Sequence, residues 1–331
     1  MSIQGNQQDR ILVTGGNGFL GSEILRQMIT QNLSVRASDR GKSSRLSGVE
    51  YCRADIVESE SLSPLFEGVN AVVHAAGLAH VFGRSGAKAA QFRAVNELGT
   101  ANVVREAVKA RVGHFILISS VSVYGDGTAK SGEDSACHPN GPYAESKWAA
   151  EQRATEIAKN GNMRLTILRL ATLYGEGDPG NVARLMRTID RNRFAWVGNG
   201  SNQKSLIYRG DAARACLIAL RSSGSGINVY NISASPVAMS EVIEGLASAL
   251  NRRAPRWRIP ASLAVSLSSI FARLVGGRGR LGTLKLTLQK WLADDVYDAS
   301  KFRDATGFET EIDLAEGLRR EVDWYRQEQS R

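Results

Sequence analysis

Cysteine and histidine are scarce in this chain of 331 residues. The three cysteines, Cys52, Cys137 and Cys216, are odd in number and far apart, so the sequence offers no disulfide framework. The four histidines form no cluster with them at the spacing of a zinc site. We therefore expect a protein of a reducing compartment that holds no metal.

Long hydrophobic runs are also missing, which argues against a membrane-spanning helix. The first ten residues, MSIQGNQQDR, lack the apolar core of a signal peptide, so we expect a cytoplasmic protein. The stretch 259–275 is shorter and more interrupted than the roughly 20 apolar residues that a bilayer requires. Because arginines surround it, it could rest on an anionic membrane surface or form a helix packed in a substrate lobe, and we favour the packed helix.

Positive charge is present in excess. Lysine and arginine number 42 against 33 acidic residues, which gives a net charge of +9. This balance favours anionic ligands. No RNA- or DNA-binding motif is present, so we do not expect a nucleic acid as partner. The length and the hydrophobic content of 43% suit one large α/β domain with an appended lobe.

A glycine-rich turn follows the first apolar run, 11–13. Gly15, Gly18 and Gly21 form a G-x-x-G-x-x-G array, and apolar residues then recur at helical spacing over 24–29. A strand, a glycine turn and a helix in succession form the dinucleotide-binding start of a doubly wound sheet. There, backbone N–H groups and the helix N-terminus hold a pyrophosphate.

Asp39 stands 24 positions after Gly15, at the end of a strand predicted over 34–38. A dinucleotide fold places at this point the carboxylate that binds the adenosine ribose hydroxyls, and such a carboxylate would repel a 2′-phosphate. We therefore expect NAD in preference to NADP, although Arg40 and Lys42 could hold the extra phosphate.

Two further strands are predicted over 49–54 and 71–75. The first ends at Asp55 and Ile56, which would line the adenine. The second is almost wholly apolar, as expected for a strand buried on both faces. Its His74 is expected to be a packed histidine and not an acid–base group.

A serine-bearing strand and a Y-x-x-x-K helix carry the candidate chemistry. The strand predicted over 115–118 delivers Ser120 and Ser122 to its carboxyl end, where open α/β sheets bind ligands. Tyr143 and Lys147 lie one turn apart on the following helix. A cation beside a tyrosine lowers the phenol's pKa from its usual value of about 10, which would make Tyr143 a usable acid–base group.

The rest of the chain completes an α/β fold. Helices are predicted over 95–110 and 182–192, and strands over 165–169 and 228–232. In the first of these helices, Leu98 is expected on the same apolar side as Val95 and Val103. The predicted fold class is a Rossmann doubly wound parallel sheet with a smaller, mostly helical C-terminal substrate lobe. The expected domains are 10–175 with return segments near 204–232 for the dinucleotide, and 176–203 with 233–331 for the substrate.

Nearly the whole chain resembles the extended short-chain dehydrogenase/reductases of the NAD-dependent epimerase/dehydratase family. The shared motifs are TGGNGFLG at 14–21, HAAG at 74–77, SSVSVYG at 119–125, YAESK at 143–147, RLATLYGEGD at 169–178, YRGDAARA at 208–215 and DASKFRDATGF at 298–308.

The resemblance implies a role for each matching residue. Tyr143 would act as base on a sugar hydroxyl, Ser120 would orient the oxygen, and Lys147 would hold the nicotinamide ribose. The residues implied in cofactor binding are Gly15, Asn17, Gly18, Phe19, Leu20, Gly21, Asp39, Arg40, Asp55, Ile56, Ala75, Ala76, Gly77, Asn96, Tyr143 and Lys147.

Departures from the family pattern reduce the number of reactions that we expect of this chain. Dehydratases and decarboxylases of the family place an acidic residue just after the catalytic hydroxyl residue, whereas this chain has Val121 and Ser122. A nucleotide-sugar 4-epimerase acting on a UDP-hexose or UDP-N-acetylhexosamine is the leading hypothesis. The alternatives are a UDP-4-keto-sugar reductase, a 3β-hydroxysteroid-type dehydrogenase, and a non-catalytic NAD(P)-sensing or scaffold protein.

The substrate contacts implied by the resemblance are spread along the chain. Asn181 and Lys204 would bind the diphosphate, and Trp196 or Val197 would line the uracil. The full implied substrate set is Ser120, Ser122, Tyr143, Thr172, Asn181, Trp196, Val197 and Lys204. Arg278 and Arg280 are either a second diphosphate clamp or solvated charges. The resemblance also suggests a homodimer that pairs the helices near 96–109 and 143–159.

Overall fold

The computed structural model describes residues 10–79, 85–125, 130–254, 258–259 and 292–330. Apart from Ile259, the stretch 259–275 lies outside these residues, as do Arg278 and Arg280.

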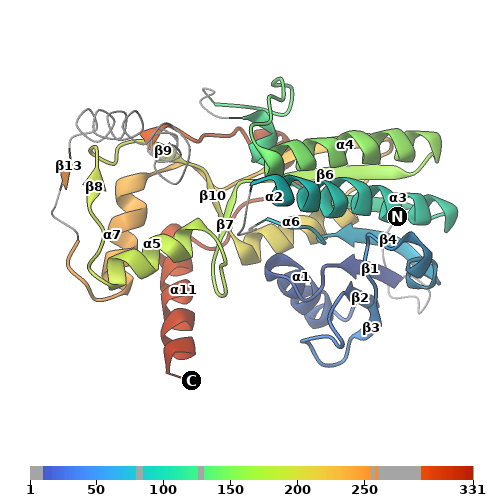
Figure 1. The fold of residues 1–331 in the computed structure, drawn as a ribbon, viewed down its shortest axis with the longest axis horizontal. Helices are drawn as coiled ribbons and strands as arrows, with labels where there is room; N and C mark the ends of the chain where they lie inside the picture. Colours follow the sequence, from blue (N-terminus) through green and yellow to red (C-terminus); the bar gives the residue numbers. More distant parts are fainter. Residues whose placement is uncertain (1–9, 80–84, 126–129, 255–257, 260–291, 331) are drawn as a thin grey trace.

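A seven-stranded parallel sheet forms the centre of the molecule's larger part (Figure 1). Its strand order is β11-β6-β5-β4-β1-β2-β3. The strands are β1 Arg10–Thr14, β2 Val35–Asp39, β3 Glu50–Arg53, β4 Val69–His74, β5 His114–Ser120, β6 Arg164–Leu170 and β11 Ile227–Ile232. The strand order reverses between β1 and β4, which creates a ligand-binding crevice at their carboxyl ends. The predicted fold class is confirmed.

Helices cover both faces of the sheet. Alternate residues of β1 point to opposite faces, so Ile11 and Val13 pack on one side and Leu12 on the other. Helices α1 (Phe19–Thr30) and α6 (Arg209–Arg221) cover the Ile11 side, and α3 (Thr100–Lys109) and α4 (Pro142–Asn160) cover the Leu12 side. A short helix, α2 (Ser85–Phe92), precedes the π-helix η3 (Arg93–Gly99) that leads into α3.

The π-helix changes one prediction. The region expected to be a single helix over 95–110 is η3 followed by α3. Because a π turn holds one residue more than an α turn, it shifts the helical phase. Leu98, predicted on the buried side, is therefore 44% exposed, whereas Val103 and Val104 of α3 are fully buried.

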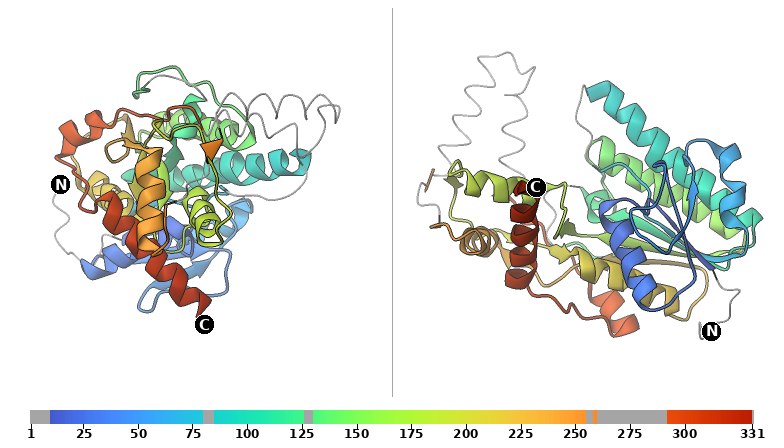
Figure 2. Two further views of the ribbon diagram at one scale, coloured as in Figure 1. Left: turned by 90° about the vertical axis from the view of Figure 1, so that its left-hand side faces the viewer. Right: turned by 90° about the horizontal axis from the view of Figure 1, so that it is seen from below.

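The second lobe gathers around its own apolar core, away from the sheet (Figure 2). Tyr174, Met186, Ile243 and Leu318 belong to that core. The lobe's elements are β7 Thr172–Tyr174, α5 Asn181–Asp190, β8 Trp196–Val197, β9 Gln203–Lys204, β10 Leu206–Tyr208, β12 Val237–Ala238, α7 Met239–Ala249, β13 Arg258–Ile259 and α11 Leu314–Gln329. The remaining helix, α10 (Ser300–Thr306), packs against β11.

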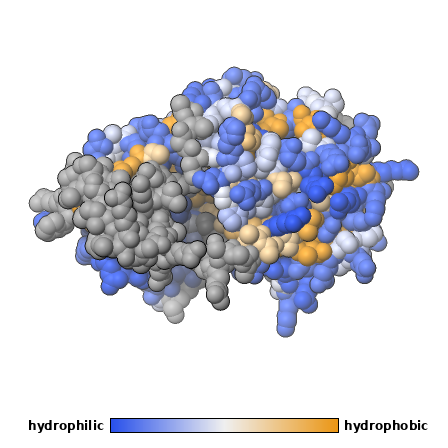
Figure 3. All heavy atoms as spheres, turned by 45° about the horizontal axis from the view of Figure 1, so that its top comes forward, coloured by the Kyte–Doolittle hydropathy of each residue, from blue (hydrophilic) through white to orange (hydrophobic). Residues whose placement is uncertain are grey.

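Short 3-10 turns complete the described chain: η1 Ser59–Ser61, η2 Ser63–Phe66 and η4 Val121–Tyr124. On the face shown in Figure 3, the described surface is mostly hydrophilic and its apolar residues form small patches. Among the described residues, no helix combines the length and the apolar character that crossing a membrane requires.

Candidate active site

Three predicted side chains meet at the carboxyl end of β5. Ser120 is the last residue of this strand, and Tyr143 and Lys147 lie near the start of α4, which packs against it. The hydroxyls of Ser120 and Tyr143 are hydrogen-bonded to each other. Lys147 Nζ donates to the carbonyl oxygen of Ile118 over 2.8 Å, which ties the helix to the strand. A phenol, a hydroxyl and an ammonium are thus held together at the binding edge of the sheet.

Burial controls the protonation of this group. It raises the pKa of Tyr143, and the hydrogen bond from Ser120 opposes the rise. It lowers the pKa of Lys147 to about 8, against the attraction of Glu151. The prediction that Lys147 lowers the pKa of Tyr143 is not met in this structure, because burial dominates and Nζ binds the Ile118 carbonyl.

Asn96 connects the catalytic helix to the loop after β4. Its Oδ1 accepts from Leu78 N (2.8 Å) and its Nδ2 donates to Leu78 O and to Ser146 Oγ (both 3.0 Å). Ser146 Oγ in turn donates to the carbonyl oxygen of Tyr143 over 2.8 Å. Asn96 is 1% exposed, so this amide holds the backbone around Gly77 and the first turn of α4 in a fixed relation.

His74 is packed, in agreement with its predicted role. Its ring lies 1% exposed between the hydroxyls of Thr14 (2.7 Å) and Thr100 (3.0 Å). Burial lowers its pKa to about 3, so the ring is neutral at physiological pH and is not an acid–base group of the site.

The glycine-rich turn brings bare backbone against the end of β4. A Cβ added to Gly15, which has a φ of +71°, would lie 2.6 Å from the nitrogen of Ala76. A Cβ on Gly21 would lie 2.1 Å from the carbonyl oxygen of Gly15. Gly18 is the exposed N-cap of α1. The turn therefore presents the N-terminus of α1 with no side chain in front of it, as a pyrophosphate site requires.

Asp39 lies directly beside this turn. Its carboxylate accepts from the backbone nitrogens of Asn17 (3.1 Å) and Arg40 (2.7 Å). The side chain at the end of β2 is therefore fixed against the loop that the phosphates would occupy, where it can accept bonds from ribose hydroxyls.

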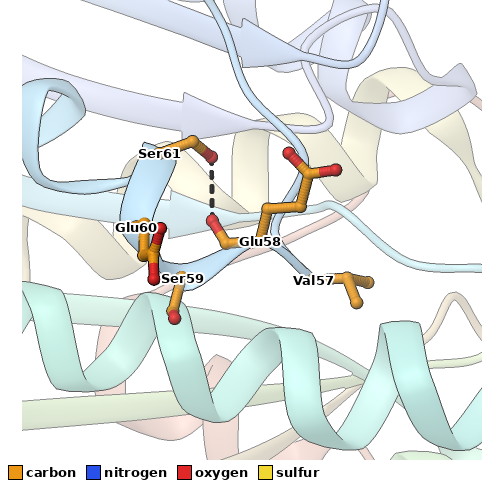
Figure 4. Close-up of a pocket in the computed structure, with 5 residues that line it drawn as sticks. All are labelled: Val57, Glu58, Ser59, Glu60 and Ser61. Carbon is orange, nitrogen blue, oxygen red and sulfur yellow. Dashed lines mark hydrogen bonds between the residues drawn. The ribbon is translucent and has the colours of Figure 1, made fainter.

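The residues after β3 lie next to an open hollow. Asp55 Oδ1 accepts from Val57 N over 3.0 Å, and Ile56 packs against Gly99. Residues 57–61 line the hollow, whose volume is about 580 Å³ (Figure 4). Two of its five side chains are the carboxylates of Glu58 and Glu60, which makes it unsuitable for phosphate groups.

The predicted substrate residues fall in the second lobe and its junction. Thr172 pairs with Leu206 in the β7–β10 ladder, and Asn181 is the exposed first residue of α5. Lys204 Nζ donates to Ala293 O over 2.8 Å. Trp196 is 3% exposed and packs edge-on against Phe194, inside the lobe core. Val197 is half-buried, so it is the more accessible of the two residues predicted at the base.

The side-chain hydroxyl of Ser122 has no hydrogen-bond partner among the described residues, in contrast to the hydroxyl of Ser120. The backbone nitrogen of Ser122 donates to Ser120 Oγ over 3.2 Å, and the Oγ of Ser122 is itself buried. A buried hydroxyl next to Ser120, the predicted catalytic serine, is suited to bind a polar group of a substrate.

Sequence reasoning missed a buried ion pair behind the site. Glu151 of α4 and Arg169 of β6 are 1% and 4% exposed and share a bidentate contact, with Arg169 Nη2 2.7 Å from Glu151 Oε2. Two signals could have revealed it: Glu151 lies one turn after Lys147 among small residues, and Arg169 interrupts an otherwise apolar strand.

Comparison with known proteins agrees with this geometry. A family model described as "NAD dependent epimerase/dehydratase family" matches residues 11–233. The chain belongs to this family. It is therefore an NAD-dependent enzyme of the extended short-chain dehydrogenase/reductase type, and its cofactor is NAD.

Relatives of this epimerase/dehydratase family member cover almost its full length. It is 27% identical to the N-acetyl-alpha-D-glucosaminyl-diphospho-ditrans,octacis-undecaprenol 4-epimerase of Escherichia coli O157:H7, with 96% of this chain and 95% of the relative aligned. It is also 27% identical to a UDP-glucose 4-epimerase of Vibrio cholerae, with 97% of each chain aligned. The structure of MoeE5 in complex with UDP-glucose and NAD has a TM-score of 0.77 and 25% identity over 97% of this chain and 99% of that one.

The residues of this family member fit NAD. The bare turn at Gly15–Gly18–Gly21 suits the pyrophosphate, and the fixed carboxylate of Asp39 suits an adenosine ribose. Gly77 leaves open the space next to Lys147: a Cβ there would lie 3.5 Å from Nζ. A nicotinamide ribose lying against Gly77 would therefore reach the ammonium.

Proposed function

We propose that this enzyme is a nucleotide-sugar 4-epimerase that acts on a UDP-hexose or a UDP-N-acetylhexosamine. The observation that carries the proposal is the meeting of Ser120, Tyr143 and Lys147 beside the glycine turn, with Val121 and Ser122 where dehydratases carry an acid. Two relatives that are named as 4-epimerases, and that align with this chain over almost their full length, support it.

Each of the three residues Tyr143, Ser120 and Lys147 has its own role in the proposed reaction. Tyr143 removes the proton from the sugar 4-hydroxyl, Ser120 donates a hydrogen bond to the same oxygen, and the ammonium of Lys147 would hold the nicotinamide ribose. NAD, when bound, supplies the hydride acceptor and donor. After the sugar has turned over as a 4-keto intermediate, C4 receives the hydride back on its opposite face and Tyr143 returns the proton to the oxygen. No net redox change results.

The second lobe would hold the nucleotide and the diphosphate. We assign Asn181 and Lys204 to the diphosphate, and Trp196 or Val197 to the base, of which Val197 is the more accessible. Thr172 and the unpaired Ser122 hydroxyl are assigned to the sugar. Lysine is a point charge and lacks arginine's planar fork, so Lys204 would bind one phosphate oxygen at a time.

A lipid-linked sugar diphosphate is a second candidate substrate. The first relative described above is named for a diphospho-undecaprenol substrate. Residues 245–293 of this chain contain nine basic and no acidic residues, equal to the whole net charge of +9. Such a charge distribution favours an anionic lipid surface.

A substrate panel separates these possibilities. The purified enzyme is incubated with UDP-hexoses, UDP-N-acetylhexosamines, a UDP-4-keto-sugar, a 3β-hydroxysteroid and a polyprenyl-diphosphate-linked N-acetylglucosamine in detergent, with and without added NAD or NADH. We expect UDP-sugars to interconvert without added coenzyme. Stoichiometric NADH consumption with a 4-keto-sugar would identify a reductase instead, oxidation of a 3β-hydroxysteroid would identify a steroid dehydrogenase, and turnover of the lipid-linked sugar alone would identify the second candidate.

We also propose a homodimer in the cytoplasm, with 10–175 and return segments near 204–232 as the dinucleotide-binding domain and 176–203 with 233–331 as the substrate lobe. The short strands β7 and β10 pack in the core of the second lobe and therefore lie at the boundary between the two parts. Leu98, exposed on η3 next to α3, lies within the region expected to pair. Measurement of the mass in solution tests the dimer, and a monomeric mass would contradict it.

A further inference from the structure

Glu151 joins the two elements that carry the catalytic residues. It lies one turn after Lys147 on α4, and it accepts hydrogen bonds from Arg169 of β6 and from Ser119 of β5. Ser119 directly precedes Ser120. A single buried carboxylate is therefore bonded to the strand that ends in the catalytic serine and is covalently part of the helix that carries the lysine.

Arg169 extends these contacts to η4 and, through Tyr124, to β11. Its Nη1 donates to the hydroxyl of Tyr124 over 2.9 Å, and its guanidinium lies over the rings of Tyr124 (5.0 Å) and Trp148 (5.6 Å). The hydroxyl of Tyr124 donates to Asn231 Oδ1 over 2.8 Å, and Asn231 Nδ2 donates to Asp298 O over 2.9 Å. The pair is thus held rigidly between β6, α4, β11 and the segment that leads to the C-terminal helices.

We propose that the buried pair Glu151–Arg169 is a positioning device for the catalytic ammonium, and that the Glu151 carboxylate keeps Lys147 charged in its desolvated place. Both residues act through Lys147 and do not contact the substrate. This inference rests on the proposed role of Lys147 in the reaction.

The charges around Lys147 support this assignment. Tyr143 and Glu151 lie on its own helix, His74 lies on β4, and Arg169 lies on β6. His74 is neutral, because burial lowers its pKa to about 3. Burial lowers the pKa of Lys147 to about 8, and the attraction of Glu151 opposes this effect. Removing the carboxylate should therefore lower the pKa of Lys147 further.

A direct titration of Lys147 tests the proposal without an activity assay. Protein labelled with [ε-13C]lysine is titrated by NMR as purified, and the Lys147 resonance is identified by its loss in Lys147→Arg. We expect Glu151→Gln to lower the Lys147 midpoint by on the order of one pH unit. The matched control is Glu156→Gln, which neutralises an exposed carboxylate on the same helix and should leave the midpoint unchanged. An unchanged midpoint in Glu151→Gln overturns the proposal.

A double variant tests whether the change in Glu151→Gln comes only from misfolding around an unpaired Arg169. Glu151→Gln leaves Arg169 buried without its partner, whereas Glu151→Leu/Arg169→Met removes both charges, a change that proteins often tolerate. Because the double variant also removes the positive charge of Arg169, it should lower the Lys147 midpoint less than Glu151→Gln does, and Glu151→Asp should restore part of the Glu151→Gln shift. If the pair were merely structural, thermal stability would fall while the midpoint stayed in place. If the titration shifts but no sugar is turned over, the proposed function fails and this inference stands.

Discussion

At the scale of single residues, the site depends on Tyr143 being buried yet able to lose a proton. Its pKa is raised by burial, and the Ser120 hydrogen bond is the only lowering contribution found among the described residues. Lys147 binds a main-chain carbonyl of the strand. Burial therefore favours the neutral phenol of Tyr143 over the phenolate.

Replacing Tyr143 by phenylalanine removes the proton acceptor and leaves the ring's packing against Phe92 in place. We expect kcat to fall by roughly 10²- to 10⁴-fold. The amount of NAD that copurifies should stay the same. The control is Tyr230→Phe, which removes a hydroxyl from β11 outside the site. Steady-state kinetics and cofactor content check both expectations, and unchanged turnover would show that Tyr143 is not the acid–base group.

At the scale of elements, the strand–turn–helix unit at residues 10–30 was predictable because the backbone of its turn can adopt this conformation only with glycine. Its strand, turn and helix follow directly from local sequence. The phase of the helix before α3 was not predictable, since a π turn leaves no signal in apolar spacing and moved Leu98 to the surface. The burial of Trp196 was likewise hidden, because it depends on Phe194 and on a distant helix.

The close approach within the glycine turn gives a prediction for this element. In Gly21→Ala the new Cβ would lie 2.1 Å from the Gly15 carbonyl oxygen, so the turn must move. We expect loss of copurifying NAD and a lower melting temperature. In the control, Gly113→Ala, the nearest atom is 3.6 Å from the new Cβ, and both properties should be retained. Normal NAD content in Gly21→Ala would show that this turn does not bind the pyrophosphate.

At the scale of the whole molecule, a buried carboxyl joins the second lobe to the turn after β7. Glu321 of α11 is 1% exposed, and its Oε2 accepts from Gly175 N over 3.0 Å. Its Oε1 is buried with no hydrogen-bond partner among the described residues. Burial and the nearby charge of Asp178 raise its pKa to about 9. The group is therefore protonated in the folded protein at neutral pH.

This raised pKa makes the folded state lose stability as the pH rises. Between the unfolded value near 4.5 and the folded value of about 9, the folded chain binds more protons than the unfolded chain. Glu321→Gln should therefore be more stable than the native protein at pH 8, by several kcal/mol (about 1.4 kcal/mol for each pH unit above 4.5), with a difference on the order of 1 kcal/mol at pH 5. Thermal unfolding at both pH values measures this. Glu309→Gln, an exposed carboxylate, is the control. An equal difference at both pH values would contradict the assignment.

The last strand of the sheet enters from far along the chain. Residues 227–232 pair with 165–170 only after the polypeptide has built α5 and much of the second lobe. A ribosome that has released only the first two hundred residues therefore exposes the unpaired backbone edge of β6 to any neighbouring nascent chain. Truncated forms ending before residue 227 should consequently aggregate, and the cofactor-binding half cannot be obtained by cutting the gene in two.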